Sequence, residues 1–344
     1  MLRGAIIGLG NVALDGHVPG WTRRDDVEIV AVSDTERERR PVAAARLPAA
    51  RWYDSADTLL AQEPLDFVDI CTPPASHGLL VCRALERGLH VLCEKPLVVG
   101  PDDLARVSRL AEATQRVVHT VHNWHHAPII KRTVQLVRQG TIGQVTRVGW
   151  QTLRTRAAAV SHADGVNWRL DPALGGGGVL TDHGWHVFYL LRNWIAGPPT
   201  SVSARLERRR HTTSPVEDTA TVHVSFPRAT AEIFLTWAAD RRDNVAELVG
   251  TDGRIDLHEE TLRLERDGRE ERWSCPPALS NGSVHPEWFD PVVDQFLGEV
   301  MGTAPRDSNL AEARLCSVLE SVARESSRRG GVPVAVPSLP IPIS

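Results

Sequence analysis

The chain has 344 residues, a formal net charge of −4, 42% hydrophobic residues and five cysteines. The length suggests about two domains, and the apolar fraction is ordinary for a chain that buries a core. The mild negative charge excludes a basic bulk surface for nucleic acid, and there is no apolar run of about 18 residues to span a membrane. An odd number of cysteines without a C-x-x-C pair argues against disulfides or a zinc ribbon and favours a reducing, cytoplasmic compartment.

Short apolar runs alternate with helical stretches over the first 122 residues. The apolar runs predict strands at residues 3–8, 27–33, 66–72, 90–94 and 116–121. The stretches between them predict helices at residues 11–23, 35–46, 55–62, 76–87 and 101–115. Continuous apolar strands that alternate with helices are typical of parallel strands covered on both faces. We therefore predict an α/β fold whose first domain, residues 1–123, is a doubly wound parallel sheet.

The pattern changes after about residue 125. Runs that alternate polar and apolar residues predict strands at 144–154, 200–208, 218–226, 230–238, 245–250 and 261–265. Helical periodicity appears at residues 129–139, 179–194, 287–300 and 310–328. Alternation is typical of antiparallel strands with one wet face, so residues 124–306 are predicted to form an α+β domain with an open, largely antiparallel sheet. A helix within 307–330 is expected to pack back on the first domain, and 331–344 to form a Pro-rich tail.

The first chemical motif is Gly8-Leu9-Gly10-Asn11-Val12-Ala13, which follows the first predicted strand and opens a helix. Small residues let the backbone approach a pyrophosphate, and the helix N-terminus favours its negative charge. Asp34, 21 residues after Ala13, is placed to accept a hydrogen bond from a ribose 2′-hydroxyl and would repel a 2′-phosphate. The motif predicts a dinucleotide site that favours NAD, while nearby Arg37 leaves NADP open. The alternative is a tight turn in an unrelated α/β protein.

Two more motifs stand at the carboxyl edge of this sheet, where ligands bind in such folds. Cys71-Thr72-Pro73-Pro74-Ala75-Ser76-His77 follows the third strand, and Glu94-Lys95-Pro96 ends the fourth. The loop is expected to pack along the dinucleotide, or else to be a plain turn into a helix. The expected cofactor contacts in these motifs are Thr72, Pro73, His77 and Glu94.

Lys95 is one of only two lysines against 37 arginines. An ammonium group at the sheet edge can stabilise a developing alkoxide, whereas arginine transfers protons poorly because its pKa is too high. The scarcity of lysine therefore favours a chemical role for Lys95 over a solvated surface position.

A fourth motif is the glycine-rich stretch Gly175-Gly176-Gly177-Gly178 that leads into a predicted helix. Asp182 and His186 are spaced i, i+4 and should share one helical face. Histidine titrates near neutral pH and suits proton exchange with an alcohol. Gly184 costs the helix about 1 kcal/mol relative to alanine, which a close ligand or backbone would explain. The alternative is an Asp–His pair on the surface.

In their order and spacing these motifs, together with Trp168-Arg169, resemble the Gfo/Idh/MocA family of oxidoreductases over about residues 3–328. The resemblance implies a Rossmann domain, a second domain on an open mixed sheet, and NAD(P)-dependent oxidation or reduction of a sugar, cyclitol or related polyol. It also implies a catalytic trio: His186 as general acid/base, Lys95 polarising the reacting oxygen, and Asp182 holding a substrate hydroxyl or orienting its neighbours. One departure is Asn123-Trp124-His125-His126-Ala127-Pro128, where the family often has Asn-x-Arg-Phe-x-Pro.

The aromatic and histidine residues near these motifs leave several roles open. Tryptophans that flank the motifs could stack on a sugar ring or belong to the core. The expected substrate contacts are Asn123, His125, Trp168, Arg169 and Trp185. The histidines at 119, 122, 125 and 126 are expected to line the pocket or to pack, and no metal site is expected.

The sequence thus predicts an enzyme that transfers a hydride between NAD(P) and a secondary alcohol or ketone of a sugar, cyclitol or related polyol. Two alternatives stay open: a redox-neutral NAD-dependent glycosidase or lyase of the same fold, and a non-catalytic NAD(P)-binding sensor. We expect no nucleic-acid or membrane partner. We also expect a homodimer or homotetramer through the second sheet, with one face too apolar for a monomer to leave exposed.

Overall fold

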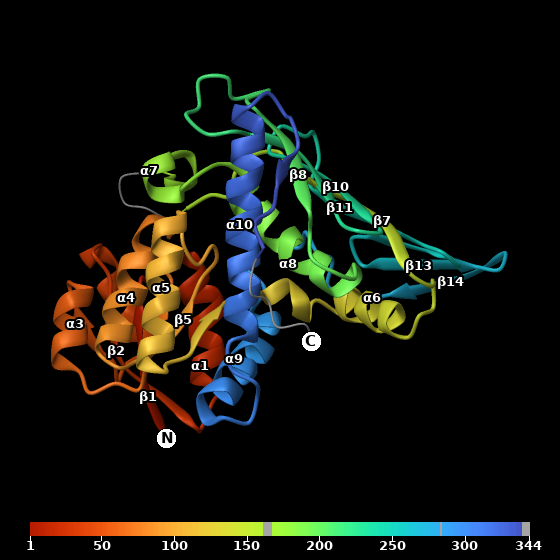
Figure 1. Ribbon diagram of the computed structural model, residues 1–344. Coiled ribbons are helices and arrows are strands. Elements are labelled where there is room, and N and C mark those ends of the chain that lie inside the picture. The colour runs from red at the N-terminus through yellow and green to blue at the C-terminus, as the bar shows by residue number, and fades with distance from the viewer. Residues whose placement is uncertain (161–166, 283, 339–344) are drawn as a thin grey trace.

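The computed structural model describes residues 1–160, 167–282 and 284–338. Two sheets form its framework, with helices α8, α9 and α10 between or beside them (Figure 1). Helices cover both faces of the first sheet, whereas the second extends away from the first as a broad, twisted layer (Figure 1). Within the described ranges, no helix has the length and apolar character needed to cross a bilayer.

The first sheet has six parallel strands in the order β3-β2-β1-β4-β5-β6. The strands are β1 (Leu2–Ile7), β2 (Val27–Ser33), β3 (Arg51–Tyr53), β4 (Phe67–Ile70), β5 (His90–Cys93) and β6 (Val118–Thr120). The helical segments between them are η1 (Ala13–His17), α1 (Val18–Thr22), η2 (Arg37–Arg39), α2 (Arg40–Arg46), α3 (Ala56–Gln62), η3 (Pro74–Ser76), α4 (His77–Glu86) and α5 (Pro101–Thr114). This strand order is that of the Rossmann fold, and the predicted doubly wound sheet is confirmed. The sequence missed β3, since three residues are too short to show a pattern.

The central strands of this sheet are buried on both faces. Neighbouring residues of a strand point to opposite faces, and Ile6 and Ile7 of β1 are both buried, as are Phe67 and Val68 of β4. Burial on both sides requires an uninterrupted apolar run, which is the pattern that identified these strands. Because the strands are parallel, the loops after β1, β4 and β5 meet at one edge, so three of the motifs lie together.

The second sheet has nine strands in the order β14-β13-β12-β11-β7-β10-β9-β8-β15. Its strands are β7 (Val145–Leu153), β8 (Ser201–Glu207), β9 (Thr219–Ser225), β10 (Thr230–Thr236), β11 (Asp243–Gly250), β12 (Arg254–His258), β13 (Thr261–Arg266), β14 (Arg269–Ser274) and β15 (Val334–Ala335). Only the described pair β7 and β10 is parallel, so the prediction of an open, largely antiparallel sheet is confirmed. The sequence missed the short strands β12 and β15, and also β14, whose mostly exposed residues show no apolar alternation.

The open face of this sheet carries both charged and apolar side chains, so the expectation of an apolar face stays a prediction. Phe234 and Val245 line it together with charged or polar residues, which include Arg147, Gln151, His223, Glu232, Glu247, Arg254, Asp256 and His258. Charged residues on neighbouring strands neutralise one another, as in the pair Arg254–Glu247 at 2.9 Å. The sequence showed the alternation but did not show that the outward residues pair across strands.

The remaining helical segments connect the two sheets. They are η4 (Asn123–His126), α6 (Pro128–Arg138), η5 (Trp168–Leu170), α7 (Pro172–Gly175), η6 (Leu180–Gly184), α8 (Trp185–Trp194), α9 (Pro286–Met301) and α10 (Ser308–Arg328). Helix α10 packs against β6 and α5 of the first sheet's layers and also against β8 and α8 (Figure 1). The helix expected to return to the first domain therefore spans both sheets. The domain boundaries remain a prediction, and the last part of the expected tail, residues 339–344, lies outside the described residues.

The predicted helix over 179–194 begins with the π-helical turn η6 rather than a regular α-turn. Tight packing explains the glycines around it. A Cβ on Gly178 would lie 1.9 Å from the carbonyl oxygen of Glu217, and one on Gly184 would lie 2.8 Å from Leu180 Cδ1. The neighbour of Gly184 is the flexible end of a leucine side chain, whereas the backbone itself approaches Gly178.

Candidate active site

The glycine loop after β1 leaves room for a ligand. Gly8 has φ +90°, and a Cβ there would lie 2.8 Å from the backbone of Cys71 and of Thr72. A Cβ on Gly10 would meet no protein atom within 4 Å, so this position borders open space. Asn11 and Val12 start the helical segment that follows, and Val12 lines the large cleft described below. The loop therefore offers bare backbone at the start of a helix, as a pyrophosphate requires.

Asp34 lies at the end of β2, beside this loop. Its carboxylate oxygens accept hydrogen bonds from the backbone N–H of Leu9 at 2.6 Å and of Glu36 at 2.8 Å. Arg37, the residue that left NADP open, is 77% exposed and pairs with Asp54. Arg39 lies closer, with its Nε 3.7 Å from the Asp34 carboxylate.

A buried charged network, which sequence reasoning missed, supports the loops at the sheet edge. His17 Nδ1 lies 2.9 Å from Asp69 Oδ2, and His17 Nε2 lies 3.1 Å from Glu94 Oε1. Trp21 Nε1 also donates to Asp69, at 2.7 Å. Burial alone would lower the pKa of His17, but Asp69 raises it well above its usual value. The imidazolium thus ties η1 to the ends of β4 and β5.

A buried histidine holds the loop after β4 by hydrogen bonds. His77 is fully buried, with Nδ1 2.7 Å from the carbonyl oxygen of Pro96 and Nε2 2.8 Å from that of Thr72. His77 therefore joins two loops and is not among the residues that line the cleft, and its expected role in cofactor binding stays a prediction. Thr72 and Glu94 line the cleft, whereas Pro73 is partly buried beside it. Within a single sequence, a histidine that joins loops cannot be distinguished from one that binds a ligand.

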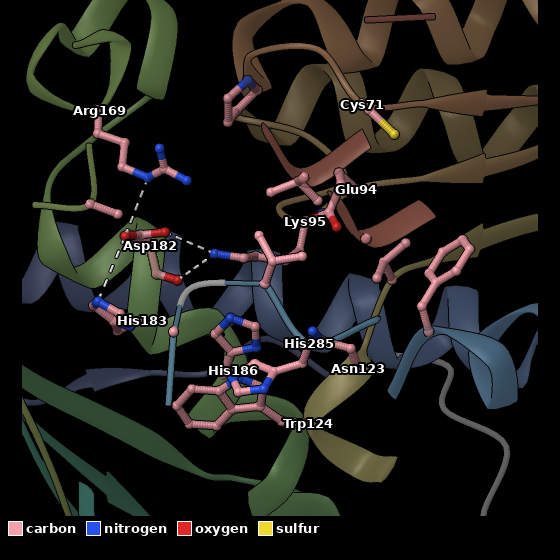
Figure 2. Close-up of a pocket in the computed structure, with 18 of the residues that line it drawn as sticks. Cys71, Glu94, Lys95, Asn123, Trp124, Arg169, Asp182, His183, His186 and His285 are labelled. Carbon is pink, nitrogen blue, oxygen red and sulfur yellow. Dashed lines mark hydrogen bonds and ion pairs between the residues drawn. The ribbon is translucent and has the colours of Figure 1, made fainter. Parts of the chain in front are cut away.

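Lys95 and Asp182 come together across the two halves of the fold. Lys95 Nζ donates to the Asp182 carboxylate at 2.9 Å and to its backbone carbonyl at 2.7 Å. Figure 2 shows Arg169 and His183 on the other side of the same carboxylate, each 3.6 Å from Oδ2. Burial alone would raise the pKa of Asp182, but the charges of Lys95 and Arg169 hold it well below its usual range. The pair is therefore a charged, partly buried bridge.

His186 lies next to this bridge and is positioned by aromatic residues (Figure 2). Its ring stacks on Trp124 with a centroid distance of 4.4 Å. Its Nδ1 lies 2.8 Å from the hydroxyl of Tyr189, which also accepts the backbone N–H of Trp124 at 3.1 Å. Burial lowers the pKa of His186 well below its usual value, so the ring is neutral near pH 7. Sequence reasoning did not identify Tyr189.

One cleft contains the three residues expected to be catalytic. It encloses about 1110 Å³ of empty space, part of it open to solvent. Lys95, Asp182 and His186 all line it, and so do Asn123, Trp168 and Arg169, three of the expected substrate contacts. Cleft residues that sequence reasoning missed are Arg154, Arg156, His183, Arg242 and His285.

Two expected substrate contacts lie elsewhere. Trp185 is 1% exposed and donates from Nε1 to His122 Nε2 at 3.0 Å, so a sugar cannot stack on it. His125 Nε2 lies 2.8 Å from Glu312, and its Nδ1 lies 3.1 Å from Asn193 Nδ2. Neither side chain is among the residues that line the cleft, so both expected substrate contacts stay predictions.

The histidine cluster is a set of hydrogen-bonded pairs with acids. His122 Nδ1 lies 2.7 Å from Glu312, and His119 Nδ1 lies 2.9 Å from Glu299. Because the nitrogen and carboxylate atoms contact each other directly, they satisfy one another's hydrogen-bonding capacity. His126 is buried and does not line the cleft. The expectation of no metal site remains a prediction.

Comparison with known proteins identifies the family. Residues 2–122 match the model described as "Oxidoreductase family, NAD-binding Rossmann fold", and residues 130–256 match "GFO/IDH/MocA C-terminal domain". The chain therefore belongs to the Gfo/Idh/MocA family of oxidoreductases, as the motifs indicated.

Three relatives illustrate the similarity. D-apiose dehydrogenase of Paraburkholderia graminis is 28% identical over 291 residues, which cover 82% of this chain and 75% of the relative. D-glucoside 3-dehydrogenase of Escherichia coli is 33% identical over 189 residues, 54% of this chain and 52% of the relative. A solved levoglucosan dehydrogenase in complex with NADH superposes with a TM-score of 0.84 at 18% identity, covering 98% of this chain and 100% of that one. Apart from the apiose dehydrogenase, the first curated relatives are matched over little more than half their length.

Proposed function

We propose that this protein is an NAD(P)-dependent dehydrogenase or reductase that acts on a secondary alcohol or ketone of a sugar, cyclitol or related polyol. The observation that carries the proposal is the meeting of Lys95, Asp182 and His186 in one cleft at the carboxyl edge of the parallel sheet. The named activities of the apiose and glucoside dehydrogenases support the substrate class.

The residues at the sheet edge fit a dinucleotide. The open space at Gly10 and the bare backbone beside it would accept the pyrophosphate, with Asn11 and Val12 at the start of the helical segment. Asp34 would accept a ribose hydroxyl, which favours NAD, although Arg39 is close enough to leave NADP open. Thr72, Pro73 and Glu94 would border the nicotinamide half. When bound, the nicotinamide ring accepts or donates the hydride.

His186 is the proposed proton donor and acceptor. Its Nε2 has no hydrogen-bond partner among the described residues, and the side chain lines the cleft. The Tyr189 oxygen already accepts from the Trp124 N–H, so its own O–H is free to donate to His186 Nδ1. That arrangement places the imidazole proton on Nε2, from which it can be transferred to a ketone oxygen.

Lys95 and Asp182 are proposed to bind the reacting oxygen and its neighbour. The ammonium would stabilise negative charge on that oxygen, because an aligned cation in a partly buried site acts without reorganisation. Asp182 holds the ammonium through two contacts and keeps one carboxylate oxygen for a substrate hydroxyl.

The test is a panel of sugars, inositols and keto-sugars, followed by nicotinamide absorbance with both cofactors. Lys95→Ala and His186→Ala should each lower kcat by about 10²- to 10⁴-fold, the usual contribution of such groups. NADH binding, followed by its fluorescence, should be retained. Matched controls are Lys131→Ala, the other lysine, and His223→Ala on the open sheet face; both side chains are exposed. Wild-type turnover in both active-site variants would refute the assignment.

The same panel separates the alternatives. Product without a net change in nicotinamide absorbance would indicate a redox-neutral glycosidase or lyase. NADH binding without turnover on any member would indicate a sensor.

We also propose a cytoplasmic homodimer or homotetramer assembled through the second sheet. The cysteines at 71, 82, 93, 275 and 316 are free thiols, which supports a reducing compartment. Because the open face carries both charged and apolar side chains, its interface would combine charge pairs with apolar contacts such as those of Phe234 and Val245. A monomer by light scattering at micromolar concentration would rule the assembly out.

A further inference from the structure

Positive charge is concentrated in the active-site cleft. Among the described residues that line it, the basic side chains are Lys95, Arg154, Arg156, Arg169 and Arg242, and the carboxylates are Glu94 and Asp182. The cleft thus has an excess of positive charge, whereas the whole chain has a net charge of −4. Such a cleft attracts anions and concentrates them.

Both carboxylates of the cleft already have partners. Asp182 binds Lys95 and lies near Arg169, and Glu94 accepts from His17 and from the backbone of Lys95. By contrast, Arg154, Arg156 and Arg242 form no ion pair with any carboxylate in the described part of the chain. Asp182 and Glu259 attract Arg154 and Arg242 from a longer distance, but no carboxylate of the described residues contacts these guanidinium groups directly.

Arg154 is the strongest case, because its side chain is only 3% exposed. It follows β7 and donates to the carbonyl oxygens of Leu153 at 2.7 Å and Asp243 at 2.8 Å. Burial and the charge of Arg242 lower its pKa to about 10, although Glu259, Asp182 and Asp243 act to raise it, so the guanidinium is still charged at neutral pH. A buried charge without a directly paired partner is costly, which favours a role for it in binding an anion.

Arg242 lies close enough to Arg154 to affect its titration, and it is held at the rim of the cleft. Its Nε donates to the carbonyl oxygen of Ser280 at 2.5 Å, and its Nη2 donates to that of Gly282. Neutral carbonyl groups position this guanidinium but do not neutralise it. Two fixed guanidinium groups in one cleft can each contribute N–H donors and positive charge to a carboxylate or phosphate.

Unsatisfied nitrogen atoms point to the same place. Arg154 Nε and His183 Nδ1 are buried without a hydrogen-bond partner in the described structure, and both residues line the cleft. Buried polar atoms are normally satisfied, so these two nitrogen atoms favour a cleft that a ligand completes.

We propose that the substrate is an anionic sugar, a sugar acid or sugar phosphate, whose carboxylate or phosphate is bound by Arg154 and Arg242. The inference rests on the proposed function, since it assigns the substrate class of the same cleft. Lys95, Asp182 and His186 act on the reacting carbon, and the two arginines fix the charged end of the molecule.

Calorimetry on the NADH-loaded protein tests the proposal with matched pairs: gluconate against glucitol, glucuronate against glucose, and glucose 6-phosphate against glucose. At least one anionic member should bind at least about tenfold more tightly than its neutral counterpart. Preference in the gluconate or glucuronate pair identifies a carboxylate, and preference in the glucose 6-phosphate pair identifies a phosphate.

Two arginine variants test whether the preference for an anion depends on Arg154 and Arg242. Arg242→Gln should weaken the preferred anion by about 10- to 100-fold and change binding of its neutral counterpart by less than about threefold. Arg154→Lys keeps the buried charge but loses the planar fork, so it should fold and show the same selective loss. Arg147→Gln, on the open face of the second sheet, is the matched control and should have no effect.

Equal or tighter binding of the neutral member in every pair would overturn the proposal, as would unchanged preference in both arginine variants. Failure of every anionic sugar to bind at about 10 mM would do the same. Failure of the proposed function looks different: anions bind with the expected preference, yet no sugar of the panel changes nicotinamide absorbance.

Discussion

Removal of the Tyr189 hydroxyl tests how the imidazole of His186 is held. This hydroxyl contacts His186 Nδ1 at 2.8 Å and accepts the Trp124 N–H at 3.1 Å. In Tyr189→Phe the imidazole loses the donor that keeps its proton on Nε2. We therefore expect a lower kcat for ketone reduction with an unchanged KM for NADH.

The magnitude follows from the bonds that are lost. One hydrogen bond of about 0.5–1.5 kcal/mol holds the tautomer, which corresponds to a loss of up to about tenfold in kcat. The Trp124 N–H is left buried without an acceptor, which should lower the free energy of unfolding by about 1–3 kcal/mol. Both effects come from a single oxygen atom, so they should appear together.

The assay is steady-state reduction of a substrate identified in the panel, with urea unfolding in parallel. Tyr53→Phe is the matched control, because Tyr53 is the only other tyrosine and its hydroxyl donates to Glu63 away from the cleft. A Tyr189→Phe protein that keeps wild-type kcat would show that the hydroxyl does not set the protonation of His186.

Three further predictions concern stability and cofactor choice. Burial lowers the pKa of His126 and of His183 to about 3, so each stays neutral in the folded protein but is protonated below about pH 6.5 in the unfolded chain. The free energy of unfolding, measured with urea, should therefore fall from pH 7.5 to 5.5, by up to about 1.4 kcal/mol per pH unit for each histidine below pH 6.5. A constant free energy of unfolding over this range would contradict the prediction. Asp34→Asn should lower the NAD-to-NADP ratio of kcat/KM at least about tenfold, since the repulsion of a 2′-phosphate is removed; an unchanged ratio would mean that Asp34 does not select the cofactor. Gly178→Ala should lower the free energy of unfolding by about 1–3 kcal/mol or more, because its Cβ would meet the backbone of Glu217. Gly100→Ala is the control and should have no such effect, because a Cβ at Gly100 would meet no atom within 4 Å. Equal effects of the two substitutions would argue against the close contact at Gly178.

Residues in local motifs could be located from the sequence, because their chemistry depends on neighbours in the chain. The glycine loop, Lys95 and Asp182 stand at the ends of strands or the start of a helix, and strand order alone brings such ends together. The family resemblance added Trp168 and Arg169, which line the same cleft from the second part of the chain. The roles of these residues remain proposals until the variants are measured.

Other site residues could not be found because their roles depend on tertiary contacts. Arg154 ends a predicted strand and looks like the other 36 arginines of the chain, and only its burial without a direct ion pair sets it apart. His17 depends on Asp69, 52 positions away, for its charge. The burial of Trp185 likewise depends on a contact that is distant in the chain, its hydrogen bond to His122.

Helix α10 makes contacts beside the active site that can form only late in the synthesis of the chain. Glu312 on this helix binds His122 and His125 beneath the cleft, and Arg324 donates to Thr181, one residue before Asp182. During synthesis on the ribosome these contacts form last, after both sheets have emerged. A nascent chain that ends before residue 308 carries the trio but lacks the helix that braces it, so catalytic competence should arrive only with the final helix.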